Sequence, residues 1–378
     1  MDFELTPEQR EIQALARDVA AAEIDPYAAD WDREHRFPSE LYPKLAELGL
    51  LGVCVPEEYG GAGADFLSYI LVLEELSRAD AGVGVTVAVH TSAVALPILS
   101  FGTEEQRARF VPALARGESI GAFALTEPEA GSDAGSLRTS AVPESGGWRI
   151  SGSKRFITSA RHAGTFLLFA RTDPASTSAA GVSAFVLDAE HVEVTRDEEK
   201  LGLNSSTTSD LALDTLVEAD RLLHKEGKGF AVAMATLDGG RIGIAAQALG
   251  IARAAFEEAT RYALQRETFG QVIAHHQAIQ FKLADMCTEI DAARLMLWRA
   301  AAKKDGGGRY TSEAAMAKLL ASEVANRVAK EAVQVFGGYG YLADFPVERH
   351  FRDAKITEIY EGTSEIQRML IARHVVEA

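Results

Sequence analysis

The spacing of apolar residues changes twice along the chain, and these changes limit the fold more than any other feature. From Thr6 onward apolar residues recur three and four positions apart, as in amphipathic helices. After Ser119 short apolar stretches are separated by turn residues, which is typical of β-strands. At Lys228 the helical spacing returns and continues to the end. The sequence therefore predicts a helical, a β and a second helical domain, over residues 1–118, 119–227 and 228–378.

The predicted fold class is α+β, with an antiparallel barrel or sandwich in the middle domain. The expected strands, at 148–152, 165–170, 182–187 and 210–213, follow one another too closely for βαβ units. No glycine fingerprint of a Rossmann unit is present. Four long helical segments predict a four-helix bundle in the last domain, at 231–265, 277–304, 311–336 and 363–376.

Composition excludes several classes of protein. The net charge of −17 disfavours binding to nucleic acid. We find no run of about 20 apolar residues and no basic leader, so we expect no membrane span and a cytoplasmic location. Cys54 and Cys287 lie in apolar surroundings without metal-ligand spacing, so we expect buried, reduced thiols and no metal site.

One candidate for a catalytic base is the carboxylate in Tyr360-Glu361-Gly362-Thr363-Ser364. Gly362 lets the backbone approach a ligand closely, and Thr363-Ser364 is a suitable start for a final helix. The alternative is an ordinary exposed carboxylate, stabilised by the dipole of the helix that it precedes. Taken alone, the stretch favours this alternative.

Two segments of the middle domain could hold a flat polar ligand. Residues 123–135 run from a strand into a loop rich in small and hydroxyl side chains, which also fits a β-turn with side-chain to backbone bonds. Residues 155–159 end another strand with an aromatic, a β-branched and a hydroxyl residue. Neither segment is specific by itself.

Three segments of the last domain could each bind a ligand or serve an ordinary structural role. Asp238-Gly239-Gly240-Arg241 opens the long helix, where Arg241 could bind an anion or form a weak surface ion pair. The two glycines cost helical stability and suggest that something packs tightly against the backbone. Residues 266–280 break two helices, and residues 334–340 end a helix in glycines, as a C-cap or a binding loop would.

In this order, the five segments together resemble the acyl-CoA dehydrogenase family. The similarity covers essentially all 378 residues, and two signature stretches, 124–136 and 334–353, match the family pattern without a gap. Residues 352–367 are most similar to the short-chain, butyryl-CoA branch. The resemblance implies an FAD enzyme that converts a short-chain acyl-CoA to the trans-2-enoyl-CoA and passes electrons to electron-transferring flavoprotein.

The resemblance also assigns the chemistry. Glu361 would remove the α-proton while hydride leaves the β-carbon for flavin N5, and burial would raise its pKa toward that task. The thioester oxygen would be held by the backbone N–H of Glu361 and a flavin hydroxyl. In isovaleryl- and long-chain-type members the base stands at the position of Gly240, which here has no side chain.

The positions that match FAD contacts are Leu125, Thr126, Ser132, Phe156, Ile157, Thr158, Arg266, Gln277, Gln334, Val335, Phe336, Gly337, Gly338, Thr363, Ser364 and Glu365. Those that match substrate contacts are Ser132, Asp238, Arg241, Tyr360 and Gly362. Phe156 replaces the usual tryptophan, and Ser159 the usual asparagine. Some FAD contacts cross a subunit interface in the family, which implies a homo-oligomer, a tetramer built as a dimer of dimers.

Two alternatives remain open. An acyl-CoA oxidase would reduce O₂ directly, although such enzymes are usually longer. A non-catalytic CoA- or flavin-binding relative would keep the fold, although Glu361 favours dehydrogenation. Acyl length depends on how residues such as Val87, Val89 and Leu96 pack, within a segment, 83–99, whose helix should be buried on most faces because it has so few charges.

Overall fold

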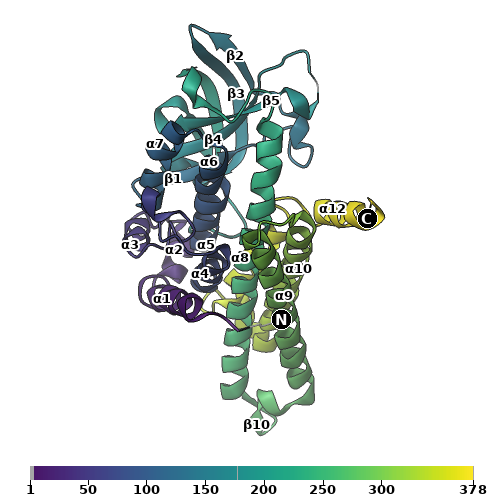
Figure 1. The fold of residues 1–378 in the computed structure, drawn as a ribbon. Coiled ribbons are helices and arrows are strands. Elements are labelled where there is room, and N and C mark those ends of the chain that lie inside the picture. The colour runs from purple at the N-terminus through teal and green to yellow at the C-terminus, as the bar shows by residue number, and fades with distance from the viewer. Residues whose placement is uncertain (1–3, 177, 378) are drawn as a thin grey trace.

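The computed structural model describes residues 4–176 and 178–377. Helices, strands and helices follow in the predicted order (Figure 1). The first region contains α1 (Pro7–Glu23), α2 (Ala28–Glu34), α3 (Leu41–Glu47), α4 (Phe66–Ala79), α5 (Ala81–Ala88), α6 (Leu96–Phe101) and α7 (Glu104–Ala115). Thr6 begins α1 with a capping box, in which Thr6 and Gln9 each accept a hydrogen bond from the other's backbone N–H.

The apolar segment at 81–101 forms a helix that is buried on nearly all sides. It comprises α5, the π-helical turn η2 (Val89–Ala95) and α6. By length and composition alone Ala81–Phe101 could cross a membrane, which the sequence analysis did not note. However, 89% of its most apolar window is buried inside the protein, as in a core helix. The expectation of a helix buried on most faces is confirmed.

The middle region is one sheet that folds over itself. Its strands are β1 (Ile120–Ala124), β2 (Ser140–Glu144), β3 (Gly147–Thr158), β4 (Ala163–Arg171), β5 (Val182–Asp188), β6 (Glu193–Asp197), β7 (Thr208–Glu218) and β8 (Leu222–Leu223). They pair in the order β6-β7-β3-β2-β4-β5-β8, with β1 beside β4. Trp148 on β3 contacts Phe185 on β5 across the fold, with ring centroids 5.6 Å apart. The sheet thus encloses its own core, as a sandwich does.

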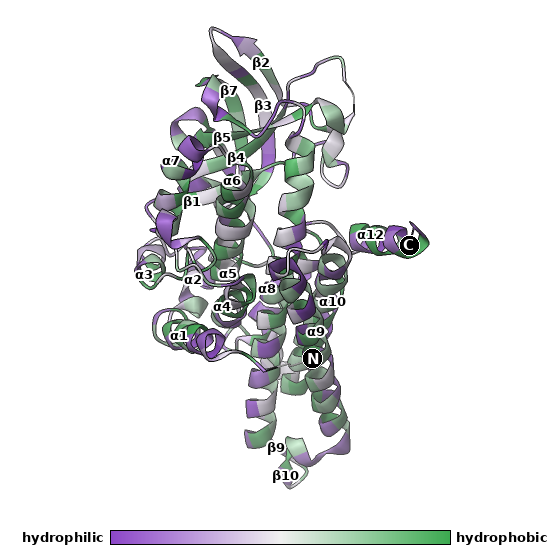
Figure 2. Ribbon diagram, in the orientation of Figure 1, coloured by the Kyte–Doolittle hydropathy of each residue, from purple (hydrophilic) through white to green (hydrophobic). Residues whose placement is uncertain are grey.

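Two pairings depart from the expected antiparallel pattern. Strands β1 and β4 are parallel, and β2 meets β4 in parallel at Ser140 and Arg171. Parallel neighbours need a long crossover connection, and the β2-β3 hairpin provides it between β1 and β4. Along β4, Phe166 belongs to the core inside the folded sheet, whereas Phe169 packs toward α6 and α7. Figure 2 shows hydrophobic residues along these strands.

The last region is helical, as expected, but its fourth long helix leaves the bundle. Helices α8 (Gly229–Gln265), α9 (Gln277–Asp305) and α10 (Thr311–Phe336) lie side by side, and the short α11 (Val347–Ala354) packs on α8 and α10. Helix α12 (Ser364–Glu377) projects outward (Figure 1), with only Ser364 and Gln367 buried among its described residues. Its apolar residues do not gather on one face, so it offers no apolar stripe to the bundle. A small hairpin, β9 (Glu267–Thr268) and β10 (Gln271–Val272), joins α8 to α9.

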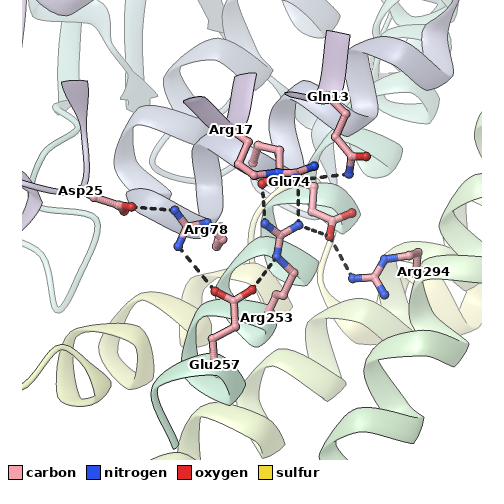
Figure 3. Close-up of polar contacts among 9 residues, drawn as sticks. Gln13, Arg17, Asp25, Glu74, Arg78, Arg253, Glu257 and Arg294 are labelled. Atoms are coloured by element: carbon pink, nitrogen blue, oxygen red, sulfur yellow. Dashed lines mark hydrogen bonds and ion pairs between the residues drawn. The ribbon is translucent and has the colours of Figure 1, made fainter. Parts of the chain in front are cut away.

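A group of ion pairs fixes the first region against the bundle (Figure 3). Arg253 on α8 donates to Glu74 and Glu75 of α4, at 2.8 and 3.0 Å. Arg294 on α9 also donates to Glu74, at 3.0 Å. Both glutamate side chains are only 1% exposed. Helix α4 is therefore held in a fixed position beside α8.

The cysteines differ from expectation in one respect. Cys54 is partly buried, and desolvation raises the pKa of its thiol to about 12. Cys287 is exposed, so the expectation of a buried thiol was wrong for this residue. It follows the buried Met286 on α9, and one residue further along a helix turns about 100° toward the outer face.

Candidate active site

Glu361 lies in a short loop between η10 (Lys355–Glu358) and α12. Its backbone has φ 52°, a left-handed conformation that is strained for a glutamate, and Gly362 follows with φ 91°. The carbonyl of Gly362 accepts hydrogen bonds from Lys318 Nζ at 2.7 Å and from Gln367 Nε2 at 2.8 Å. Buried donors on α10 and α12 thus hold the loop in this conformation.

The Glu361 carboxylate points at Gly240 on α8. A Cβ atom added at Gly240 would lie 2.6 Å from Glu361 Oε2, closer than real Cβ contacts allow. Segment 238–241 was predicted to open the long helix. It lies inside α8 instead, because the helix begins at Gly229. The expectation that something packs tightly against these glycines is confirmed at Gly240. At Gly239 the nearest atom would be Lys304 Nζ, at 3.8 Å.

This geometry makes Gly240→Ala and Gly239→Ala a matched pair. Each change should stabilise α8 by up to about 1 kcal/mol, because alanine favours a helix over glycine. Only Gly240→Ala forces the Glu361 carboxylate to move, and a displacement of that size can cost about 10²-fold in rate.

If Glu361 is a catalytic base, Gly240→Ala should fold normally and lose reaction rate, whereas Gly239→Ala should keep both its fold and its rate. Thermal unfolding would measure the stability of both variants, and their turnover of substrate would measure the rate. Equal rates for the two variants would contradict the assigned position of the carboxylate.

The Glu361 carboxylate is electrostatically unusual. Its Oε2 atom is buried and has no hydrogen-bond partner among the described residues. Desolvation raises the pKa of Glu361 to about 7, while the nearby cations of Arg241 and Lys318 oppose that shift. A carboxyl group with a pKa near neutrality is well matched to accepting a proton from a weak acid.

Arg241 is a fixed cation beside this carboxylate. Its side chain is 5% exposed and forms an ion pair with Asp238, whose Oδ2 accepts a hydrogen bond from Thr311 at 2.6 Å. The alternative of a surface ion pair is therefore wrong. Burial tends to lower the pKa of Arg241, and the charges of Asp238 and Glu361 oppose this. Arg241 Nε has no partner in the described part of the chain.

The face of α8 that meets Glu361 continues to a buried polar pair. Gly240, Gly243 and Gln247 are spaced by three and four residues and share this face. A Cβ at Gly243 would approach Leu73 of α4, and also Ala88 and Ser92. At the end of this strip, Tyr360 Oη donates to Gln247 Oε1, and Gln247 Nε2 donates to the Ala81 carbonyl at 2.7 Å.

The sequence analysis missed several residues of this site. It named Val87, Val89 and Leu96 as examples of residues whose packing matters, but not Ala88 and Ser92, which lie 3.7 and 3.6 Å from a Cβ added at Gly243. It also missed Gln247, Lys318 and Gln367. A polar residue on an otherwise apolar helix face could have identified such positions, as for Lys318 among the alanines of α10.

The two predicted ligand segments of the middle domain lie together. The Arg155 N–H donates to the Thr126 carbonyl at 2.9 Å, which joins the loop after β1 to the end of β3. Beneath them, the fully buried Lys154 donates to the Leu125 carbonyl at 3.1 Å and to Glu127 at 2.8 Å. Phe156 is 56% exposed as a residue, and its backbone has φ 60°. Ile157 is buried, Thr158 is partly exposed, and Ser132 is exposed in the same loop region.

A second set of predicted positions lies at the other end of α8. Arg266, Val335, Phe336, Gly337 and Gly338 line one open cavity of about 430 Å³. Gln334 and Gln277 are exposed at the end of α10 and the start of α9. Thr363, Ser364 and Glu365 lie apart from this cavity, at the start of α12.

The two sets lie toward opposite ends of α8, because Gly135 of the first loop lies near Phe230 and Arg266 follows the last residue of the helix. Helix α8 begins at Gly229, where a Cβ would touch Ser183 of β5, and ends at Gln265 next to β9. Its 37 residues correspond to about 55 Å. The cavity that contains Arg266 and the loop of the middle domain are therefore separated by much of the length of α8 within one chain.

Comparisons with known proteins identify the family of the chain. Residues 6–118, 122–216 and 227–376 match the N-terminal, middle and C-terminal domains of acyl-CoA dehydrogenase. The short-chain specific acyl-CoA dehydrogenase of Clostridium acetobutylicum is 48% identical over 98% of this chain and 99% of that protein.

Two solved structures superpose over the whole chain. Butyryl-CoA dehydrogenase of Megasphaera elsdenii is 45% identical, with a TM-score of 0.98 over 100% of both chains. A chain solved in work on the electron transferring flavoprotein of Acidaminococcus fermentans is 46% identical, with a TM-score of 0.99 over 100% of both chains. The chain belongs to the acyl-CoA dehydrogenase family, whose members are FAD-dependent flavoprotein oxidoreductases.

The residues present fit this cofactor. Phe156 is a largely exposed aromatic residue that could pack against a flat ring system, and the Arg155 guanidinium lies 4.8 Å from the centroid of its ring. The Lys154–Glu127 ion pair holds the loop after β1 in place. Glu127 ties this loop to the residue before β2 as well, because it accepts a hydrogen bond from the Thr139 N–H at 3.0 Å. Within residues 4–176 and 178–377, the hydroxyl groups of Thr126, Ser132 and Thr158 make no hydrogen bond and remain available to a ligand.

Proposed function

We propose that this acyl-CoA dehydrogenase oxidises short-chain acyl-CoA to trans-2-enoyl-CoA, with Glu361 as the base that removes the α-proton. The observation that carries the proposal is the unpartnered Glu361 Oε2, held against Gly240 with its pKa raised to about 7. A buried carboxylate without a partner is costly to the fold, which is typical of a functional group.

Each residue of the site has a separate role in the proposed reaction. Glu361 takes the α-proton, and the electron pair of the broken C–H bond forms the new double bond. When bound, FAD supplies the acceptor for the hydride that leaves the β-carbon. The Glu361 N–H makes no hydrogen bond in the described part of the chain, so it is free to donate to the thioester oxygen. Leu125, Thr126, Phe156, Ile157 and Thr158 would hold the flavin, and Asp238 and Arg241 fix charge beside the base.

The preference for a short chain is supported by the Gln247–Tyr360 pair. Gln247 lies seven residues beyond Gly240, about 10 Å along the same face of α8. Its side chain is fully buried and hydrogen-bonded on both sides, by Tyr360 and to Ala81. This pair would end the space available to an acyl chain that starts beside Glu361.

A series of acyl-CoAs tests the proposal. We expect butyryl- and hexanoyl-CoA to bleach the flavin under anaerobic conditions much faster than octanoyl- or isovaleryl-CoA. Gln247→Ala should shift the optimum toward longer chains, whereas Gln247→Leu, which keeps the bulk, should not. Failure of every acyl-CoA to bleach the flavin would refute the proposed function, and an unchanged optimum in Gln247→Ala would refute the assigned limit.

The electron acceptor and the assembly are parts of the same proposal. The similarity to a chain solved in work on an electron transferring flavoprotein supports transfer of electrons to such a protein. Peroxide formed during aerobic turnover without an added acceptor would indicate an oxidase instead. The two cofactor-binding sets at opposite ends of α8 support a homo-oligomer in which neighbouring chains complete each FAD site, such as a tetramer.

A further inference from the structure

Lys318 is a buried lysine that the proposed reaction does not use. It lies on α10 with no exposed surface and forms no ion pair among the described residues. Its Nζ donates to the carbonyl of Gly362 at 2.7 Å. Burying an ammonium group against a neutral carbonyl is costly. A neutral donor could hold the same carbonyl, so a structural role alone does not explain why a lysine stands at this position.

Lys318 is the first of three donors along one face of α10. Ser322 donates to the Thr357 carbonyl at 2.8 Å, and Asn326 donates to the Ala354 carbonyl at 2.9 Å. The three donors are four residues apart and follow the segment from Ala354 to Gly362. Only Lys318 is charged, and it is the donor next to Glu361.

We propose that Lys318 is a positioning residue for the dehydrogenation proposed above, on which this inference rests: its ammonium group holds the Gly362 carbonyl and favours the carboxylate form of Glu361. The first effect fixes the direction in which Glu361 points toward Gly240. The second keeps the base charged, because a cation near a carboxylate stabilises its ionised form.

The surrounding charges give the direction of the effect. Lys318 is faced by Glu361, by Arg241 of α8, by Glu358 of η10 and by Glu365 of α12. Desolvation lowers the pKa of Lys318 to about 7, and the negative charge of Glu361 opposes this. Lys318 and Arg241 in turn lower the pKa of Glu361. Loss of the ammonium group should therefore raise the pKa of Glu361 above its present value.

The test compares Lys318→Met with Ser322→Ala and Asn326→Ala, which remove neutral donors of the same row. The Glu361 titration is followed in holoenzyme as the carbon-13 carboxyl signal that is missing from Glu361→Gln, and the pH profile of flavin reduction by butyryl-CoA is measured beside it. We expect Lys318→Met to move both midpoints up by about one unit, which slows the reaction about tenfold on the acid side. The two control variants should lose some thermal stability with unchanged midpoints.

Unchanged midpoints in Lys318→Met, or equal shifts in the controls, would overturn the proposal. Lys318→Gln keeps a donor without the charge and should shift the midpoints in the same direction if Lys318→Met does not fold. Failure of both variants to retain FAD would assign Lys318 to the fold alone and overturn the proposal as well. A wild-type enzyme that no acyl-CoA reduces would refute the proposed function instead, and the carboxyl titration would still report on Lys318.

Discussion

Glu361→Gln is expected to lower the rate of flavin reduction by butyryl-CoA about 10³-fold while FAD remains bound. The amide has the shape of the carboxylate, so the contact with Gly240 and the bonds that hold the Gly362 carbonyl should persist. It cannot accept the α-proton, however. Anaerobic stopped-flow absorbance of the flavin measures the rate, and the spectrum of the resting enzyme measures the FAD content.

Glu289→Gln is the matched control for this substitution. Glu289 lies on α9, where it forms an exposed ion pair with Arg327 at 3.2 Å. Exposed pairs contribute little to stability, so this variant should reduce its flavin at the wild-type rate. Complete bleaching of Glu361→Gln at a comparable rate would rule out Glu361 as the base. Loss of FAD from Glu361→Gln alone would show that the carboxylate acts in cofactor binding.

The pH dependence of the wild-type enzyme follows from the same group. The base acts as a carboxylate, and burial raises the pKa of Glu361 to about 7. The rate should therefore fall as the pH decreases through about 7, rather than through the range near 4 that is typical of an exposed glutamate. The sequence alone could suggest this shift only through the family resemblance, because the burial of Oε2 depends on contacts with α8.

The order of the three regions could be predicted because it depends on local patterns. A change from apolar residues three and four positions apart to short apolar stretches separated by turn residues indicates a change from a helical to a β region. Pairing within the sheet could not be predicted in this way. The parallel contacts of β4 with β1 and β2 depend on which edges meet after the hairpin folds over.

The helical pattern was predicted from 231 and α8 begins at Gly229, but segment 238–241 was wrongly assigned to the start of this helix, for a physical reason. Gly239 and Gly240 weaken a helix locally, so the sequence favours a helix that begins there. In the structure, packing against α4 and α10 stabilises α8 on both sides of the glycines. Gly240 is instead required by Glu361, which is 121 positions away in the chain and 2.6 Å from the missing Cβ. No spacing rule relates two residues so distant in sequence.

The ion pairs around Arg253 connect the fold to the site. Helix α4 carries Glu74 and Glu75, and it also carries Leu73, which faces Gly243 on the strip that leads from Glu361 to Gln247. Arg253 contacts both glutamates from α8, ten residues beyond Gly243. These contacts therefore set the distance between the two helices that would enclose the acyl chain.

Arg253→Met should destabilise the protein by about 3–5 kcal/mol, because removal of one partner leaves buried carboxylates without compensation. Glu74 keeps Arg294 at 3.0 Å, but among the described residues Glu75 retains only Gln13 at 3.1 Å and Arg17 at 3.8 Å. The thermal midpoint of unfolding, measured at saturating FAD, should fall clearly. Arg33→Met, which removes a pair with Asp30 whose side chains are 69% and 60% exposed, should leave the midpoint nearly unchanged. If both variants unfold at the wild-type temperature, the pairs at Arg253 do not hold α4 against α8.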